Sequence, residues 1–412
     1  MRTRTRHRIA AAACAVATCA LGVAAQSPAQ DRAELQSTDL ISRSTSGGIP
    51  NGPSTNAVIS GDRRYSRLIA FESEASDLIA GDTNGLKDVF VVVRGGRYSN
   101  VGEEWRPGST RLVSRGLGGA PANGPSWGAA VDGDFDHGQA NCVAFLSSAS
   151  NLVRGDTNGR VDAFLVKRPG GSPVRVSLPG NRQSREDATA VDVSGDCRKT
   201  AFVIGGRLYV RGSKTLKLRH AKPAADPYFA EGRTSDIVFG APGGVYLARE
   251  GRYRPSLVAP GGSNPAFNNI KRQVVAYERP VGGGTQVVFK DLGRDERVAS
   301  ARSGRVGNDD SHHPVIGNSG YYISFESNAD NLGTTSTGRL YDDNDAPDVY
   351  LYTDVRKITL AQSVFEKGVP VNGGGRRPSM SFYANYIVFH ANAPLGSRRG
   401  TPQIWMRYLG PV

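Results

Sequence analysis

The sequence predicts an all-β protein, specifically a seven-bladed β-propeller of four-stranded antiparallel blades. Three observations predict this fold. The chain of 412 residues is rich in turn formers, with 51 Gly and 23 Pro. After Gln36, no long stretch has the spacing of apolar residues that a surface helix needs. Short apolar strand patterns recur in a fixed order, which is the signature of a repeat architecture.

Three of the four strands of each predicted blade can be read directly as repeats. The second strand carries an "AF"-like pair followed by a small or polar residue, and the third is a run around one aromatic residue. Second strands begin near Arg67, Asn141, Lys199, Asp236, Gln273, Tyr322 and Tyr386. Third strands begin near Asp88, Asp162, Arg207, Gly244, Gln286, Asp348 and Gln403. Fourth strands begin near Thr110, Val174, Leu216, Arg254, Glu296 and Arg356. The patterns of the second and third strands therefore alternate seven times, whereas the fourth-strand pattern appears only six times.

The missing fourth strand has a counterpart at the other end of the chain. "TDLISRS" at Thr38 matches the fourth-strand pattern but follows no other strand of a blade. An N-terminal strand that completes the last blade removes both exposed edges of a circular array. This predicts a closed propeller rather than an open solenoid, with six blades as the alternative count.

An acidic motif recurs in the loop between the second and third strands of the longer blades. "DTNGLKDVF", "DTNGRVDAF" and "DDNDAPDVY" place carboxylate and amide oxygens at alternating positions, which suits Ca²⁺. The alternatives are a turn pinned by its own hydrogen bonds and a direct contact with a ligand. The candidate calcium ligands are Asp82, Asn84, Asp88, Asp156, Asn158, Asp162, Asp342, Asn344, Asp345 and Asp348.

A second set of polar residues lies on the loops that join one blade to the next. In a propeller these loops open onto the same face as the loops that carry the acidic motif. Convergent polar groups around a channel mouth are typical of a ligand-binding surface. The candidate ligand-binding residues are Asn51, Asn123, His312, His313 and Asn372.

The N-terminus predicts export. Four arginines precede an apolar, alanine-rich segment that ends in "VAA", so residues 1–25 are interpreted as a signal peptide, 26–37 as a linker and 38–412 as the propeller. A lipoprotein with Cys19 as its lipid-attachment site is the alternative. Removing residues 1–25 lowers the net charge from +13 to +9, because that segment holds four arginines and no acid. We expect a secreted protein, extracellular or in the cell envelope.

Composition also limits the partners. Basic residues are scattered, with no run of five, so a nucleic-acid-binding stripe is not indicated. No apolar run after the signal is long enough to span a membrane. We expect a monomer that binds an unknown protein or a cell-envelope glycan. Cys142 and Cys197 remain in the exported chain and are predicted to form a disulfide, with two free thiols as the alternative.

The segments "SNPAFNNIKRQVVAYE" and "SHHPVIGNSGYYISFES" resemble the TolB-type, WD-repeat-like propeller repeat. The acidic-loop version of the repeat resembles secreted bacterial propellers of unassigned function. The resemblance covers residues 38–412. It implies a propeller fold and, by analogy with TolB, an envelope-assembly role with a protein partner.

Signatures of catalysis are weak. The sequence has no nucleophile elbow, zinc-protease helix or phosphate-binding loop. Glu72 and Glu326, which recur in "FES", could act as an acid and base on a glycan, or could simply cap a repeat. We therefore expect a non-catalytic binding module, with a polysaccharide hydrolase or lyase and a TolB-like assembly protein as alternatives.

Overall fold

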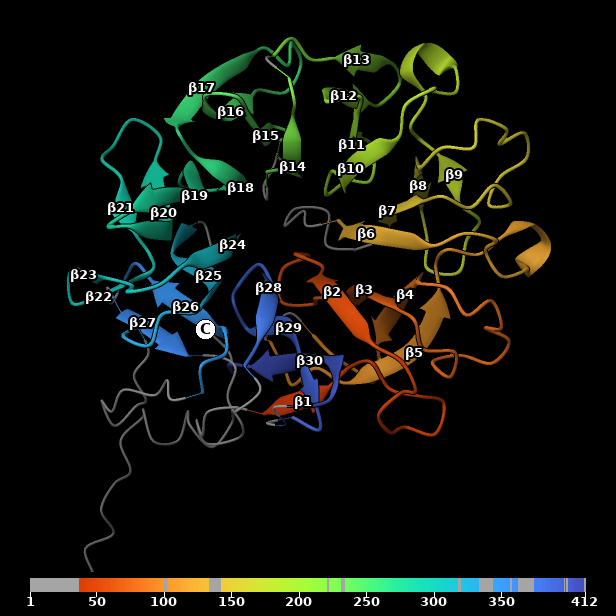
Figure 1. The fold of residues 1–412 in the computed structure, drawn as a ribbon, viewed down its shortest axis with the longest axis horizontal. Helices are drawn as coiled ribbons and strands as arrows, with labels where there is room; N and C mark the ends of the chain where they lie inside the picture. Colours follow the sequence, from red (N-terminus) through yellow and green to blue (C-terminus); the bar gives the residue numbers. More distant parts are fainter. Residues whose placement is uncertain are drawn as a thin grey trace, which may run out of the picture.

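The computed structural model contains seven four-stranded antiparallel sheets arranged in a ring (Figure 1). It describes residues 37–99, 102–132, 142–220, 222–230, 234–317, 320–332, 344–355, 358–361, 374–395, 397 and 399–410. The predicted seven-bladed propeller is confirmed, and the six-bladed alternative is wrong. Within the described residues, no helix is long and apolar enough to cross a membrane.

Blades 1 to 3 follow one another along the chain, each running from its innermost to its outermost strand. Blade 1 contains β2 (Ser54–Ile59), β3 (Leu68–Ser73), β4 (Asp88–Arg94) and β5 (Pro107–Leu112). Blade 2 contains β6 (Ser126–Val131), β7 (Val143–Ser147), β8 (Asp162–Val166) and β9 (Val174–Arg175). Blade 3 contains β10 (Ala188–Val193), β11 (Thr200–Ile204), β12 (Arg207–Arg211) and β13 (Thr215–Lys217). Two short 3₁₀ turns, η1 (Leu117–Gly119) and η2 (Pro179–Asn181), lie in the connections between these blades.

Blades 4 to 6 repeat the same order. Blade 4 contains β14 (Ala225–Phe229), β15 (Ile237–Ala241), β16 (Gly244–Ala248) and β17 (Pro255–Pro260). Blade 5 contains β18 (Ser263–Asn268), β19 (Val274–Val281), β20 (Gly284–Asp291) and β21 (Arg297–Val298). Blade 6 contains β24 (Ser311–Gly317), β25 (Tyr322–Ser327), β26 (Asp348–Thr353) and β27 (Ile358–Ala361). A two-stranded hairpin that the repeat pattern does not predict, β22 (Ala301–Arg302) with β23 (Arg305–Val306), lies between blades 5 and 6.

The two ends of the chain share the seventh blade. β28 (Arg376–Met380), β29 (Tyr386–Ala393) and β30 (Thr401–Tyr408) form its first three strands, and β1 (Thr38–Leu40) is the fourth. In the β1–β30 pair, Leu40 lies opposite Trp405. The predicted ring closure by the N-terminal strand is therefore confirmed.

The repeated aromatic residues of the second and third strands face each other within a blade. Phe71 lies opposite Phe90 in the strand register, and their ring centroids are 5.9 Å apart. Four other blades have a stacked pair of the same kind: Phe145–Phe164, Phe202–Tyr209, Phe239–Tyr246 and Phe325–Tyr350. Burying an aromatic side chain of this size contributes roughly 2–3 kcal/mol. These repeated aromatic residues are thus part of the apolar layer by which each blade packs on the next.

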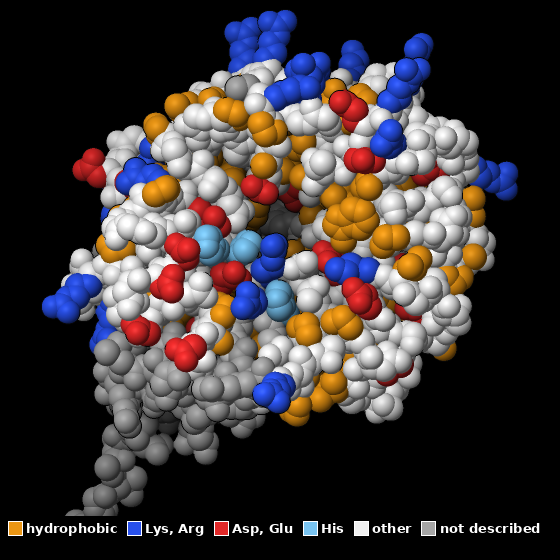
Figure 2. All heavy atoms as spheres, in the orientation of Figure 1, with side chains coloured by type: hydrophobic (Ala, Val, Ile, Leu, Met, Phe, Trp, Pro, Cys, Tyr) orange, Lys and Arg blue, Asp and Glu red, His pale blue; other side chains and the backbone are white. Residues whose placement is uncertain are grey.

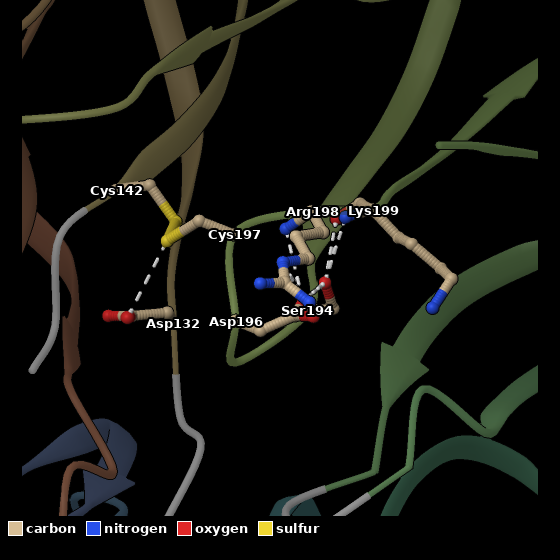
Figure 3. The surroundings of a disulfide bond; sticks show 7 residues. All are labelled: Asp132, Cys142, Ser194, Asp196, Cys197, Arg198 and Lys199. Carbon is tan, nitrogen blue, oxygen red and sulfur yellow. Dashed lines mark hydrogen bonds and ion pairs between the residues drawn. A yellow bond between two sulfur atoms is a disulfide. The ribbon is translucent and has the colours of Figure 1, made fainter. Parts of the chain in front are cut away.

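A disulfide joins blades 2 and 3. Cys142 precedes β7, and Cys197 lies in the turn between β10 and β11, with an S–S distance of 2.03 Å and a Cα–Cα distance of 6.0 Å. Asp132, at the end of β6, places a carboxylate oxygen 3.6 Å from Cys197 Sγ (Figure 3). The predicted pairing is confirmed, and the alternative of two free thiols is wrong.

Candidate binding site at the channel mouth

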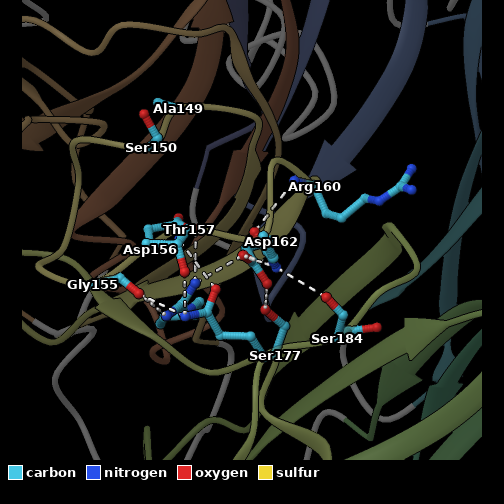
Figure 4. Close-up of polar contacts among 12 residues, drawn as sticks. Ala149, Ser150, Gly155, Asp156, Thr157, Arg160, Asp162, Ser177 and Ser184 are labelled. Carbon is cyan, nitrogen blue, oxygen red and sulfur yellow. Dashed lines mark hydrogen bonds and ion pairs between the residues drawn. The ribbon is translucent and has the colours of Figure 1, made fainter.

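The acidic loop motif folds into a turn that is pinned by its own side chains (Figure 4). In blade 2, Asn158 donates a hydrogen bond to the Asp162 carboxylate at 3.0 Å and accepts one from the backbone N–H of Arg160 at 3.2 Å. Ser177 on the fourth-strand side donates to the other Asp162 oxygen at 2.5 Å. These bonds fix the start of the third strand, which is what the turn hypothesis predicts.

Blade 1 repeats this arrangement with one change. Asn84 and Ser114 donate to the two oxygens of Asp88 at 2.7 and 2.5 Å. In blade 2 the guanidinium of Arg175 lies 2.8 Å from Asp156 and 3.1 Å from Asp162. The corresponding register position in blade 1 is Leu112, which carries no charge. Among the described residues, the acidic pair of blade 1 therefore has no counterpart of Arg175.

Burial perturbs the titration of the acidic pair in blade 1. Burial, reinforced by the charge of Asp82, raises the pKa of Asp88 to about 6, although its hydrogen bonds from Ser114 and Asn84 oppose the rise. Burial also raises the pKa of Asp82. Calcium at these loops stays a prediction, and blade 1 is the loop that best tests it.

The third copy of the motif lies partly outside the described residues. Asp342 is not among them, whereas Asn344 donates to Asp348 at 3.2 Å and Asp345 adopts a positive φ of 53° in the turn. The described part of this third copy thus keeps the hydrogen bond from Asn to Asp that blades 1 and 2 contain.

We expect millimolar calcium to leave the melting temperature unchanged relative to a chelator. In blade 1 both Asp88 oxygens already accept hydrogen bonds, and the Asn84 side-chain oxygen accepts the N–H of Leu86 at 2.9 Å. The measurement is a thermal melt of the wild type and of Asp82→Asn. A calcium-dependent rise in the wild type that Asp82→Asn abolishes would instead assign the ion to blade 1.

The loops between blades dock on their neighbours through two predicted ligand residues. The Asn51 amide donates to Ser76 Oγ at 2.9 Å and accepts the Ser76 N–H at 3.0 Å. Asn123 repeats both bonds with Ser150, each at 2.9 Å. The glycine that follows is required by this docking, because a Cβ on Gly52 would lie 2.8 Å from the backbone N of Ala75.

These contacts give Asn51 and Asn123 a structural role in docking the loops. They do not test whether either residue contacts a ligand. A third copy of this docking, made by Asn308 with Asp330, has no "NGPS" motif, so the sequence analysis missed it. Asn372 lies outside the described residues.

The innermost strands carry a β-bulge near the ends where the candidate histidines lie. In six blades the strand register shifts at a residue with positive φ, an uncommon conformation for residues other than glycine. These residues are Asn56, Gly128, Asp226, Asn264, His313 and Arg377. A bulge turns side chains toward a new direction, so this ring of positions shapes one mouth of the channel.

Carboxylates tie several of these bulges to the preceding blade. Glu72 accepts the N–H of Gly128 at 2.8 Å, and Glu278 accepts the N–H of His313 at 2.8 Å. Glu326 accepts the N–H of Arg377. Each glutamate directly follows the aromatic residue of the second strand. The "FES" glutamates therefore cross-link neighbouring blades, which the sequence patterns left open.

The predicted histidines lie in β24, the innermost strand of blade 6, and not in the loop before it as expected. There they pair with the same acids at this mouth. His312 Nδ1 is 3.2 Å from Glu278, and His313 Nδ1 is 3.1 Å from Glu326. Burial opposes ionisation of Glu326, but the hydrogen bond and charge of His313, together with the Arg377 N–H, lower its pKa to about 2. Burial lowers the pKa of His390 to about 4, although the charge of Glu326 acts in the opposite direction. Glu326 is thus held as a carboxylate and His390 as a neutral imidazole.

Both signs of charge gather around the central hollow (Figure 2). Arg376 and Arg377 on β28 are exposed, and across the described ranges neither guanidinium has a hydrogen bond or ion pair. Trp127 occupies in blade 2 the register position that His312 has in blade 6, and it is half-buried opposite Leu146. The mouth therefore has a charged side at blades 5–7 and an aromatic position at blade 2. Sequence reasoning missed the two arginines and Trp127, because nothing in the local pattern marks them as facing the mouth.

A hollow of about 1080 Å³ lies between blades 5 and 6, on loops of the opposite face. Arg272 bridges Asp291 and Asp354 there, with contacts of 2.7 and 2.9 Å. Arg297 also contacts both acids, the closer at 2.5 Å. Arg272 and Arg297 of this hollow are thus already engaged in ion pairs with its acids, so the hollow is a weaker candidate for ligand binding than the mouth.

Acidification should destabilise the fold through His390. Its pKa lies below the ordinary value of 6.5, so the unfolded chain takes up the proton first. The contribution of His390 to the free energy of unfolding is fully present above pH 6.5 and decreases as the pH falls toward about 4, by roughly 3 kcal/mol. The charged neighbours that act on it are Glu326, Arg377, Arg376 and His313.

Urea denaturation of the wild type and of His390→Gln across this pH window isolates that contribution. Gln keeps an acceptor for the Asn56 N–H, which lies 3.5 Å from His390 Nδ1, but it does not titrate. Equal pH dependence of the two proteins would contradict the assignment.

Comparison with known proteins gives similarity of fold at low sequence identity. No family model and no curated protein matches the sequence. TolB from Acinetobacter baumannii is 14% identical, with a TM-score of 0.40, and the alignment covers 65% of this chain and 63% of that one. The β-propeller domain of the Trilobed protease from Pyrococcus furiosus is 8% identical, with a TM-score of 0.49, covering 88% of this chain and 98% of that one. The Pyrococcus horikoshii acylaminoacyl peptidase is 9% identical, with a TM-score of 0.49, covering 86% of this chain and 50% of that one.

Proposed function

We propose that this seven-bladed propeller with a TolB-like repeat is an exported, non-catalytic binding protein that holds its ligand at the channel mouth. One observation carries the proposal. Side chains from blades 1, 5, 6 and 7 converge on one mouth, where hydrogen bonds between blades hold several of them in place. Preorganised groups of this kind lower the entropy cost of binding.

The chemistry of the mouth supports binding rather than catalysis. A general acid needs a pKa near the working pH, whereas that of Glu326 is lowered to about 2. Glu278 is held between the His313 N–H and His312 Nδ1, and Asn264 also donates to it at 2.6 Å. These carboxylates therefore connect neighbouring blades through hydrogen bonds.

Export is supported by two features. Residues 1–25 have the charge and hydropathy of a signal peptide, and Cys142 and Cys197 form a disulfide, which persists in oxidising compartments. We place the protein outside the cytoplasm, in contact with the envelope.

The test is capture of envelope components by the immobilised chain. Protein and glycan fractions of an envelope extract are passed separately over the wild type, over Trp127→Ala with His312→Ala, and over a control. The control is Arg182→Ala with Arg185→Ala, two exposed residues of the loop between blades 2 and 3. We expect one fraction to bind the wild type and the control, to be lost from the mouth variant, and to be recovered chemically unchanged.

Two results would contradict the proposal. Equal capture by all three proteins would show that the ligand does not bind at the mouth. Recovery of a shortened or otherwise cleaved glycan would make the protein an enzyme.

A further inference from the structure

We infer that Arg376 and Arg377 form an anion-binding site at the channel mouth, and that the ligand is an anionic glycan. The inference rests on the proposed function and names the chemistry of its ligand. The site follows from a contrast among the charged groups of the mouth. His312 and His313 each have an acidic partner within 3.2 Å, and Lys87 lies 3.7 Å from Glu72. The two arginines have no such partner in the described part of the chain.

The backbone around the two arginines is fixed, which makes the site more than a mobile surface charge. The N–H of Arg377 is held by Glu326, and Arg376 lies opposite His390 in the strand register. Arg377 has a positive φ of 47° in the bulge, so the two neighbouring side chains are not in the ordinary alternation of a strand. A guanidinium offers a planar fork of N–H donors that matches a carboxylate or phosphate.

The rest of the mouth favours a sugar chain over a peptide as the carrier of the anion. Asn56 and Asn264 are half-buried, and each donates its amide N–H to a glutamate, which leaves the amide oxygen to accept a sugar hydroxyl. Trp127 adds a half-buried aromatic ring on the other side of the mouth. A peptide would most simply add as a strand to an innermost strand, but the bulges interrupt that edge.

The acids of the mouth accept hydrogen bonds from other groups and not from the guanidinium groups of Arg376 and Arg377, within the described residues. Glu278 and Glu326 are engaged by His312 and His313, and Glu72 by Asn56 and Gly128. Burial and the charge of Glu278 raise the pKa of Asp226, in blade 4, whereas the charges of His313 and Arg377 act in the opposite direction. The exposed guanidinium donors at β28 are therefore available to a polyanion, which the basic chain as a whole also attracts.

The experiment is calorimetric titration of the mature chain with four defined polymers. These are polygalacturonate, poly(ribitol phosphate), neutral dextran and poly-glutamate. We expect a polyuronate or a phosphodiester glycan to bind, dextran not to bind, and the acidic peptide to bind more weakly. The first two arms identify which acid the site prefers.

The variants are R376A/R377A and the control R182A/R185A, which removes the same charge from the outer part of the same face. We expect the first to weaken binding of the anionic glycan roughly ten-fold or more, and the control to change it by less than about two-fold. The melting temperature should stay unchanged in both, because the guanidinium groups make no bond within the described structure.

Three results would overturn the inference. Equal losses in both double variants would mean attraction to overall charge. Binding of poly-glutamate as tight as that of the glycans, and lost in R376A/R377A, would make the ligand an acidic peptide. Failure of all four polymers, beside successful capture at the mouth from an envelope extract, would refute the anionic glycan and leave the proposed function standing.

Discussion

A chain that begins at Thr45 should be less stable than one that begins at Ser37 by about 5 kcal/mol or more. The shorter chain lacks β1 and the residues that anchor it. Ile41, which is 1% exposed, packs in the core between blades 7 and 1. Ser42 donates to Gln403 at 2.8 Å and accepts the N–H of Ile404 at 3.0 Å. Loss of a buried isoleucine costs about 2–5 kcal/mol, and the hydrogen bonds add about 1 kcal/mol each.

The deletion also leaves β30 as an exposed edge, so we expect aggregation at concentrations where the longer chain stays monomeric. The measurement is urea denaturation with light scattering on both chains. The chain starting at Ser37 is the matched control, because it has been truncated in the same way but keeps β1. Equal stability of the two would show that the ring does not depend on the N-terminal strand.

Replacing both Cys142 and Cys197 by serine should lower the free energy of unfolding by about 4 kcal/mol. The cross-link spans a sequence separation of 55 residues and joins two blades, so its loss restores much of the entropy of the unfolded chain. Cys142 is fully buried, so the serine hydroxyl adds a further cost.

Urea denaturation of the variant, and of the wild type with and without reductant, measures the effect. The wild type with reductant separates loss of the bond from the cost of the new hydroxyl. A reduced wild type as stable as the oxidised protein would show that the disulfide does not stabilise the propeller.

Much of the fold could be predicted because each blade repeats its apolar pattern. Phe71 and Phe90 hold the repeated aromatic positions of the second and third strands in blade 1, and in the structure their rings stack on each other. The strand at Thr38 could be assigned to the last blade, because the N-terminus has an extra fourth-strand pattern and the last blade has no fourth strand of its own. The hairpin of Ala301–Arg302 and Arg305–Val306 could not, since it belongs to one junction only.

The site was predicted only in part, and the reason is geometric. His312 and His313 were predicted at this mouth from the order of the loops, although they lie in β24 and not in the loop before it. The bulges that aim Arg377 and Asn264 depend on how an inner strand packs against the next blade, and no local sequence signal specifies that. Asn51 and Asn123 were recognised as repeated, but repetition alone could not separate loop docking from ligand binding.

Hydroxyl-radical footprinting of the protein with its captured envelope fraction tests the central claim most directly. We predict protection of Trp127, His312 and His313 when the ligand is bound, with Tyr321 beside the opposite hollow labelled as in the free protein. Protection of Tyr321 without protection of the mouth residues would contradict the account, because the ligand would then lie on the other face.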